Sequence, residues 1–366
     1  MIICITIFGL IVLLYFLSQI ILIGTFVQLE EKNAKQNIER GKNAILDDIN
    51  RIDSITTDWA AWDDSYNFVQ NSNEGYIKSN LDPSTLLNLR INFMLFYNIS
   101  GHLIYGEGVD IKNKEKTEIP AIFQPDLSPN DILLKHAEKN SSINGIIILP
   151  EGPTLIASQP IITSEYQGPI RGTLIVGRFL DSEEIEHLAN ITQLSLSNSF
   201  DDPNNSDFRS AIQLLSKEKP ILIRPKSNDI IAGYYLLNDI EGNPAIVIKA
   251  EMPREIHQQG DITMNYLMLS IIVSGLVFGL VTLLLLEKNV LSRLAFLSSN
   301  VSAIGASSDR SMRLSMPGND ELSNLAKVIN NMLEELEKAD DAKTKQLLLK
   351  EIFHRVKNKK QMFLKS

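Results

Sequence analysis

Cysteine is nearly absent from this sequence: one residue of 366, Cys4, is a cysteine. A single cysteine excludes an internal disulfide framework and any metal site built from several cysteines. Acidic side chains outnumber basic ones by 44 to 35, which argues against a general nucleic-acid-binding protein. The remaining composition is ordinary, so wholesale disorder and collagen-like repeats are excluded. The length allows two or three folded units.

Charge is absent from two long stretches, residues 1–29 and 262–286. A helix of about 20 apolar residues crosses the hydrocarbon layer of a bilayer, and both stretches are long enough. A cleaved signal peptide is the alternative for the first stretch. Its apolar run exceeds the usual signal length, however, and Gly24-Thr25-Phe26 makes a poor cleavage site. The sequence therefore predicts two transmembrane helices, and Gly275 and Gly279 form a small-xxx-small pair in the second.

The two flanking regions differ in charge. Residues 30–261 carry a net charge of −13, whereas residues 287–366 carry +4. Positive segments next to a span stay on the cytoplasmic side. We therefore predict a two-pass protein of the cell membrane, with residues 30–261 extracytoplasmic and the C-terminus cytoplasmic. Four basic residues just after the first span run against this rule: Lys32, Lys35, Arg40 and Lys42.

Residues 30–66 have the apolar spacing of one long helix, which would form a stalk between membrane and domain. Its stripe consists of Ile38, Ile45, Ile49, Ile52, Ile55, Trp59, Trp62 and Tyr66. Strands are predicted at 91–97, 102–105, 145–149, 154–162, 173–179, 230–238 and 245–251. Asp181 is expected to cap a short helix that runs to Asn190. Loops are expected at 112–118 and 199–206. The fold class is thus α+β, with an antiparallel sheet and flanking helices.

The segment Asp58–Val69, with its Trp-Ala-Ala-Trp-Asp-Asp core, resembles an extracytoplasmic sensor domain of the fourth CHASE class. The resemblance continues through Gly145–Pro153, Ser158–Ile161, Gly168–Leu174, Gly177–Asp181 and Met252–Arg254, and covers nearly all of residues 30–261. It implies a Cache- or PAS-like fold that binds a small molecule outside the membrane. No ligand identity follows from it.

Six residues of this region are candidate ligand contacts. An arginine on a sheet face can hold a carboxylate in a bidentate manner, so Arg171 and Arg178 are candidates, although an internal Arg–Asp pair explains them equally well. The aromatic spacing around position 62 indicates a core stripe first and a ligand-facing wall second. The remaining candidates are Trp62, Asp63, Tyr66 and Tyr97.

The inner segment, residues 287–340, shows two heptad seams separated by a connector that contains Gly305, Ser307, Ser308, Pro317 and Gly318. Asp320 and Glu321 open the second helix, where negative charge is favourable. This arrangement, and above all the string Asp320–Met332, resembles a HAMP linker. The resemblance implies a dimeric parallel helical bundle that switches between two packings. An ordinary amphipathic hairpin is the alternative.

Residues 341–366 continue as a helix whose string Leu349–Asn358 resembles the phosphoacceptor box of the second HisKA-type class of sensor histidine kinases. In that class the histidine before Arg-Val-Lys-Asn accepts the phosphoryl group, which places the role on His354. The sequence departs from the class at Phe353 and at Lys359-Lys360. We expect the kinase to be truncated within this helix, without an ATP-binding domain and therefore without activity of its own.

Together these features predict a two-component membrane sensor that passes an extracellular small-molecule signal through HAMP to a phosphoacceptor helix. The expected partners are the small molecule, the membrane, a second copy or a full-length kinase, and a response regulator. Neither a nucleic acid nor a metal is expected. ATP and Mg²⁺ would act only through a kinase domain outside this chain. The alternatives are a non-enzymatic subunit that heterodimerises with a complete kinase, and a gene fragment.

Overall fold

The computed structural model describes residues 2–307 and 311–363. The predicted segments also include Met1, residues 308–310 and residues 364–366, which lie outside the described residues. The chain divides into two compact units. One unit is Gln19–Met264, and the other joins Met1–Ser18 to Asn265–Ser366. The mixed helix and sheet class predicted from the sequence is confirmed.

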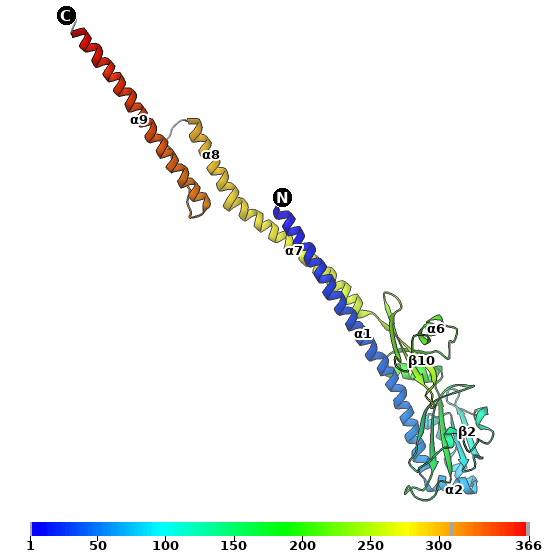
Figure 1. The fold of residues 1–366 in the computed structure, drawn as a ribbon. Helices are drawn as coiled ribbons and strands as arrows, with labels where there is room; N and C mark the ends of the chain where they lie inside the picture. Colours follow the sequence, from blue (N-terminus) through cyan, green and yellow to red (C-terminus); the bar gives the residue numbers. More distant parts are fainter. Residues whose placement is uncertain (1, 308–310, 364–366) are drawn as a thin grey trace. The chain divides into compact units, whose positions relative to one another are not determined.

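The long helix α1 (Ile2–Ala60) is drawn in blue in Figure 1. It carries the predicted apolar stripe, and its isoleucines at 38, 45, 49 and 52 are buried. The prediction that this helix continues to Tyr66 is wrong. The Ala60 carbonyl accepts a hydrogen bond from the Ile162 amide, and Ala61 forms a bridge with Ile162. Sheet pairing therefore replaces helical pairing at this point, and a new helix, α2 (Asp63–Asn71), begins two residues later.

The first sheet is antiparallel, with six strands in the order β3-β2-β1-β6-β5-β4. Its strands are β1 (Phe93–Asn98), β2 (Leu103–Asp110), β3 (Glu115–Thr117), β4 (Ile143–Leu149), β5 (Gly152–Ile161) and β6 (Gly172–Phe179). Five of them confirm predicted strands. The sixth, β3, lies within a predicted loop, because three exposed polar residues on an edge strand give no apolar signal.

A second antiparallel sheet, with the order β7-β10-β9-β8, corrects the prediction of a single sheet. Its strands are β7 (Ser195–Asn198), β8 (Ile221–Pro225), β9 (Ile230–Asn238) and β10 (Pro244–Pro253). The hairpin of β9 and β10 was predicted, whereas the short outer strands β7 and β8 were not. Helix α5 (Ser182–Thr192) leads from the first sheet to the second, and Asp181 caps it as predicted by accepting hydrogen bonds from two backbone amides.

The first sheet has an apolar core on each face. One core lies against α1 and the small helices α2, α3 (Glu74–Asn80) and α4 (Pro83–Leu89). The other is covered by the segment that holds the 3₁₀ turns η1 (Ala121–Phe123) and η2 (Ile132–Leu134). A shorter helix, α6 (Ser206–Ile212), packs on the second sheet. Gly177 is needed where β1 and β6 pair, since an added Cβ would lie 2.0 Å from the Phe93 ring.

The other unit contains α7 (Glu255–Leu286) from Asn265 onward, the π turn η3 (Glu287–Leu291), α8 (Ser292–Ser307) and α9 (Glu321–Phe363). The two apolar helices meet at the predicted small residues: a Cβ on Gly275 would lie 2.5 Å from Ile11, and one on Gly279 would lie 3.5 Å from Ile7. Helix α8 packs on α9 through a small core of Leu297, Ile304, Leu314, Ala326 and Leu333.

Candidate functional sites

Three of the six candidate ligand contacts gather at one corner of the first sheet. The Arg171 guanidinium lies 3.7 Å from the centroid of the Tyr66 ring, and the Tyr66 hydroxyl donates to the Pro169 carbonyl. The Asp63 carboxylate accepts a hydrogen bond from the Ser164 amide, and the Ser164 hydroxyl accepts one from the Asp63 amide. These contacts fasten α2 to the turn between β5 and β6, so the three side chains already have partners within the fold.

Trp62 belongs to the core. Its ring lies 5.8 Å from Trp59 and 5.8 Å from Tyr76, in a cluster that continues to Phe68 and Phe96. Burial raises the pKa of Tyr76 to about 12, and its hydroxyl contacts that of Ser65 at 2.6 Å. This cluster holds α2 and α3 against the sheet, and it is the core stripe that the spacing indicated.

Tyr97 and Arg178 lie on opposite faces of the first sheet. Tyr97 is fully buried beneath the 3₁₀ segment, where its hydroxyl donates to the Phe123 carbonyl at 2.8 Å and burial raises its pKa. Arg178 faces α1, where its guanidinium contacts Asp48 at 2.7 Å and donates to the Arg90 carbonyl. The six candidates therefore do not converge on one cavity.

Arg178 is part of a buried charged network that joins α1 to α5. Glu184 on α5 lies 3.8 Å from Arg178 and 2.8 Å from Arg90, whose guanidinium also contacts the His187 ring. Burial raises the pKa of Glu184, and the nearby arginines oppose that rise. Burial also lowers the pKa of His187, and Arg90 adds to this shift. Arg178 therefore forms an internal Arg–Asp pair with Asp48, which is the alternative to a ligand contact that the sequence left open.

A second buried ion pair, between Glu30 and Arg254, lies in the unit Gln19–Met264 where β10 leads into α7. Glu30 on α1 accepts two hydrogen bonds from Arg254, at 2.8 and 2.9 Å, and both side chains are nearly inaccessible to solvent. Arg254 also donates to the Ser227 carbonyl. Sequence reasoning gave neither residue a role. A signal was present, because Glu30 precedes Ala34 and Ile38 by four and eight residues on the same buried stripe.

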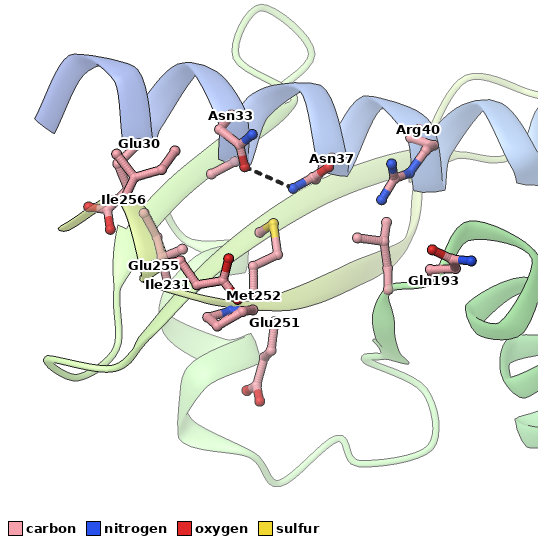
Figure 2. Close-up of a pocket in the computed structure, with 13 residues that line it drawn as sticks. Glu30, Asn33, Asn37, Arg40, Gln193, Ile231, Glu251, Met252, Glu255 and Ile256 are labelled. Atoms are coloured by element: carbon pink, nitrogen blue, oxygen red, sulfur yellow. Dashed lines mark hydrogen bonds between the residues drawn. The ribbon is translucent and has the colours of Figure 1, made fainter. Parts of the chain in front are cut away.

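Beside this pair a groove of about 240 Å³ runs between α1 and the second sheet (Figure 2). Its floor is apolar and consists of Ala34, Leu194, Ile231 and Met252. Its rim is polar: Figure 2 shows Glu30 and Glu255 at one end, Arg40 and Gln193 at the other, and the hydrogen-bonded amides of Asn33 and Asn37 between them. Sequence reasoning missed this groove, since its walls come from segments far apart in the chain.

In the inner helices, the Asp320 carboxylate accepts hydrogen bonds from the Arg293 guanidinium and from the backbone amide and the hydroxyl of Ser323. The hydrogen bond from Arg293 is the main reason why the pKa of Asp320 lies far below its usual range. Arg293 also donates to the Pro317 carbonyl, so this network ties the start of α8 to the start of α9. Glu321, the second predicted signalling residue, begins α9 and is exposed.

His354 lies on α9 and its side chain is exposed. The apolar residues around it are exposed too, with Leu349, Ile352, Phe353 and Val356 between 54% and 75% accessible. Among residues 2–307 and 311–363, no group of three or more His, Cys, Asp or Glu side chains is placed to hold a metal ion.

Two described helices are long and apolar enough to cross a membrane, within Ile5–Ala60 and Glu255–Ser307. Residues 44–199 match the CHASE4 domain family. The chain is 32% identical over 317 residues to the methanogenesis regulatory histidine kinase FilI of Methanothrix harundinacea. That similarity spans 86% of this chain and 35% of FilI, so the chain spans about a third of the length of its curated relative.

The solved structures that resemble this chain are distant from it. The extracellular domain of vpHK1S-Z8 aligns with 64% of this chain and 95% of its own, at 12% identity and a TM-score of 0.44. The periplasmic domain of Vibrio cholerae LuxQ aligns with 61% of this chain and 98% of its own, at 12% identity and a TM-score of 0.36. The family match and the relationship to FilI are the informative findings. The chain thus carries the CHASE4 sensor domain of a histidine-kinase-type membrane receptor.

Proposed function

We propose that this chain is the input part of a two-component receptor: it detects a small molecule outside the cell and presents a phosphoacceptor histidine inside. The similarity to FilI over 86% of the chain carries this proposal. The two apolar helices would separate an outer region, residues 30–261, from inner helices that begin at residue 287. The charge of +4 on residues 287–366 supports a cytoplasmic C-terminus.

We propose that α8, the connector and the first half of α9 act as a HAMP relay within a dimer. In α9, Ala326 and Leu333 pack against α8, whereas Leu325, Met332 and Leu336 are exposed. With 100° of turn per residue, these exposed side chains form a second apolar face beside the first. Two copies that join these faces would bury them in a four-helix arrangement, which supports a homodimer.

His354 would accept the phosphoryl group. An imidazole nitrogen attacks the γ-phosphorus of ATP, the bond to the ADP oxygen breaks, and the N–H proton leaves to solvent. ATP and Mg²⁺ would be held by a catalytic domain outside these 366 residues, in the same polypeptide or in a partner. The exposure of His354 on α9 supports this role, because such a domain needs access to the ring. The product would then pass its phosphoryl group to a response regulator.

The test is a fusion of the FilI catalytic domain to the end of this chain, purified in lipid nanodiscs and incubated with radiolabelled ATP and Mg²⁺. We expect acid-labile, alkali-stable label in the fusion and none after His354→Gln. The His136→Gln fusion, a matched control in the outer region, should keep the label. A fusion that binds ATP but stays unlabelled, or label that survives His354→Gln, would refute the role of His354.

A further inference from the structure

The groove beside the Glu30–Arg254 pair contains one cationic side chain whose charge no neighbour balances. Glu30 is neutralised by Arg254 at 2.8 Å, and Glu251 lies 2.8 Å from Lys226 and 3.0 Å from Lys249. Among residues 2–307 and 311–363, Arg40 and Glu255 make no ion pair, and both side chains are exposed to solvent. After internal pairing, the groove therefore has a positive end at Arg40 and a separate negative end at Glu255 (Figure 2).

The positive end also carries neutral hydrogen-bond donors. Gln193 lies beside Arg40 in Figure 2, and Asn37 lies one helical turn before Arg40 on α1. The Asn37 amide donates one hydrogen to Asn33 and has a second one to offer. A guanidinium with side-chain amides next to it is suited to a carboxylate, which Arg can bind through two parallel hydrogen bonds.

Gln193 ends α5 in a left-handed conformation, with φ +55° and ψ +38°. Ser72 and Arg90 end α2 and α4 in the same way, so this geometry is that of a helix C-cap. A glycine at position 193 would keep this backbone conformation and remove the side-chain amide. Gln193→Gly therefore tests the amide without disturbing the end of α5.

From these observations we propose that the groove is a binding site for a small carboxylate with an apolar body. The carboxylate would bind Arg40, Gln193 and Asn37, and the body would cover Met252, Leu194 and Ile231. The proposal rests on the proposed function, because it names a ligand class for the receptor. A bound ligand would bridge α1 to β10, and β10 leads directly into α7.

The test uses the full chain in nanodiscs and isothermal titration, with empty nanodiscs subtracted. The probe is hexanoate. Hexylammonium supplies the same chain with opposite charge, and acetate supplies the carboxylate without the chain. We expect hexanoate to bind more tightly than either. Arg40→Gln should weaken it at least tenfold, and Arg40→Lys should weaken it less. Gln193→Gly should weaken it severalfold without lowering the melting temperature, while Arg171→Gln, at the far corner of the first sheet, should not change it.

Absence of hexanoate binding at millimolar concentrations would overturn the proposal. So would equal binding of hexylammonium, or unchanged binding in Arg40→Gln. This outcome is independent of the phosphoryl relay, since binding is measured without ATP. If hexanoate binds but the fusion is never labelled at His354, the groove is a binding site and the phosphoryl relay is refuted. If His354 is labelled but hexanoate does not bind, the relay is supported and the groove proposal is refuted.

Discussion

The Arg178 side chain on β6 is 1% accessible, and its guanidinium is bonded to Asp48 on α1 and to the Arg90 carbonyl. A carboxylate that is taken out of water needs such a partner, because an unpaired buried charge is strongly destabilising. The pair therefore holds α1 against the first sheet.

We predict that Arg178→Met destabilises the outer region strongly, by about 3–5 kcal/mol, because it leaves Asp48 without its counter-charge and Glu184 with Arg90 alone. The double variant Arg178→Met with Asp48→Leu should recover a large part of that loss. Urea unfolding followed by tryptophan fluorescence measures both. A single variant as stable as the parent would show that the pair is not coupled to folding.

His136 contacts the hydroxyls of Ser141 and Ser158, each at 3.0 Å, and burial lowers its pKa to about 4. The unfolded value is about 6.5, so the unfolded state binds the proton first as the pH falls. The contribution of neutral His136 to folding stability is therefore fully present above about pH 6.5 and is lost as the pH falls from about 6.5 to 4. Between pH 7 and 5 the expected loss is about 2 kcal/mol.

The measurement for this prediction is the free energy of urea unfolding at the two pH values. His136→Gln should lose that part of the pH dependence. His187 has a lowered pKa as well, so a smaller dependence of the same sign should remain. A variant with the full dependence of the parent would assign the effect to other groups.

Among the helices and strands, the sequence predicted those whose apolar residues recur with a regular period and missed those without such a pattern. The strands with apolar or alternating patterns were found, as was the cap at Asp181, since each depends on neighbours in the chain. β7 and β8 were missed because they are short, and most of their residues are only partly buried. The break at Ala60 was missed because a distant strand causes it through Ile162.

The pairing of β1 with β6 requires a glycine at position 177, opposite Phe93. A Cβ at Gly177 would lie 2.0 Å from the Phe93 ring and could not be accommodated by a small shift. We predict that Gly177→Ala destabilises the outer region by about 3 kcal/mol or more, at the upper end for overpacked cores. Gly305→Ala is the matched control, because nothing lies within 4 Å of its added Cβ. Thermal unfolding should separate the two, and equal melting temperatures would contradict this pairing.

For the whole molecule, the exposed face of α9 predicts self-association. In a Cys4→Ser background, we expect Met332→Cys to form a disulfide-linked dimer upon mild oxidation in membranes. Lys327→Cys should crosslink little, because 100° of turn per residue places position 327 on the opposite side of α9. Gel electrophoresis without reductant reads the result. Equal crosslinking at both positions would argue against a seam at Leu325, Met332 and Leu336.

Composition over whole segments predicted more of the candidate function than single residues did. Two uncharged stretches, a net charge of −13 between them and +4 after them predict a two-pass membrane protein before any site is known. The groove and the Glu30–Arg254 pair needed the structure, because each joins α1 to residues about 220 positions later.

Labelling with a membrane-impermeant maleimide shows whether residues 30–261 lie outside the membrane and α9 inside, as the proposed receptor requires. In the Cys4→Ser background, single cysteines would replace Asn204, in the outer region, and Thr344, on α9. Both positions are exposed. We predict that the cysteine at 204 is labelled in intact cells, whereas the cysteine at 344 is labelled only after permeabilisation. Labelling at 344 in intact cells, with protection at 204, would mean that the chain has the opposite orientation in the membrane.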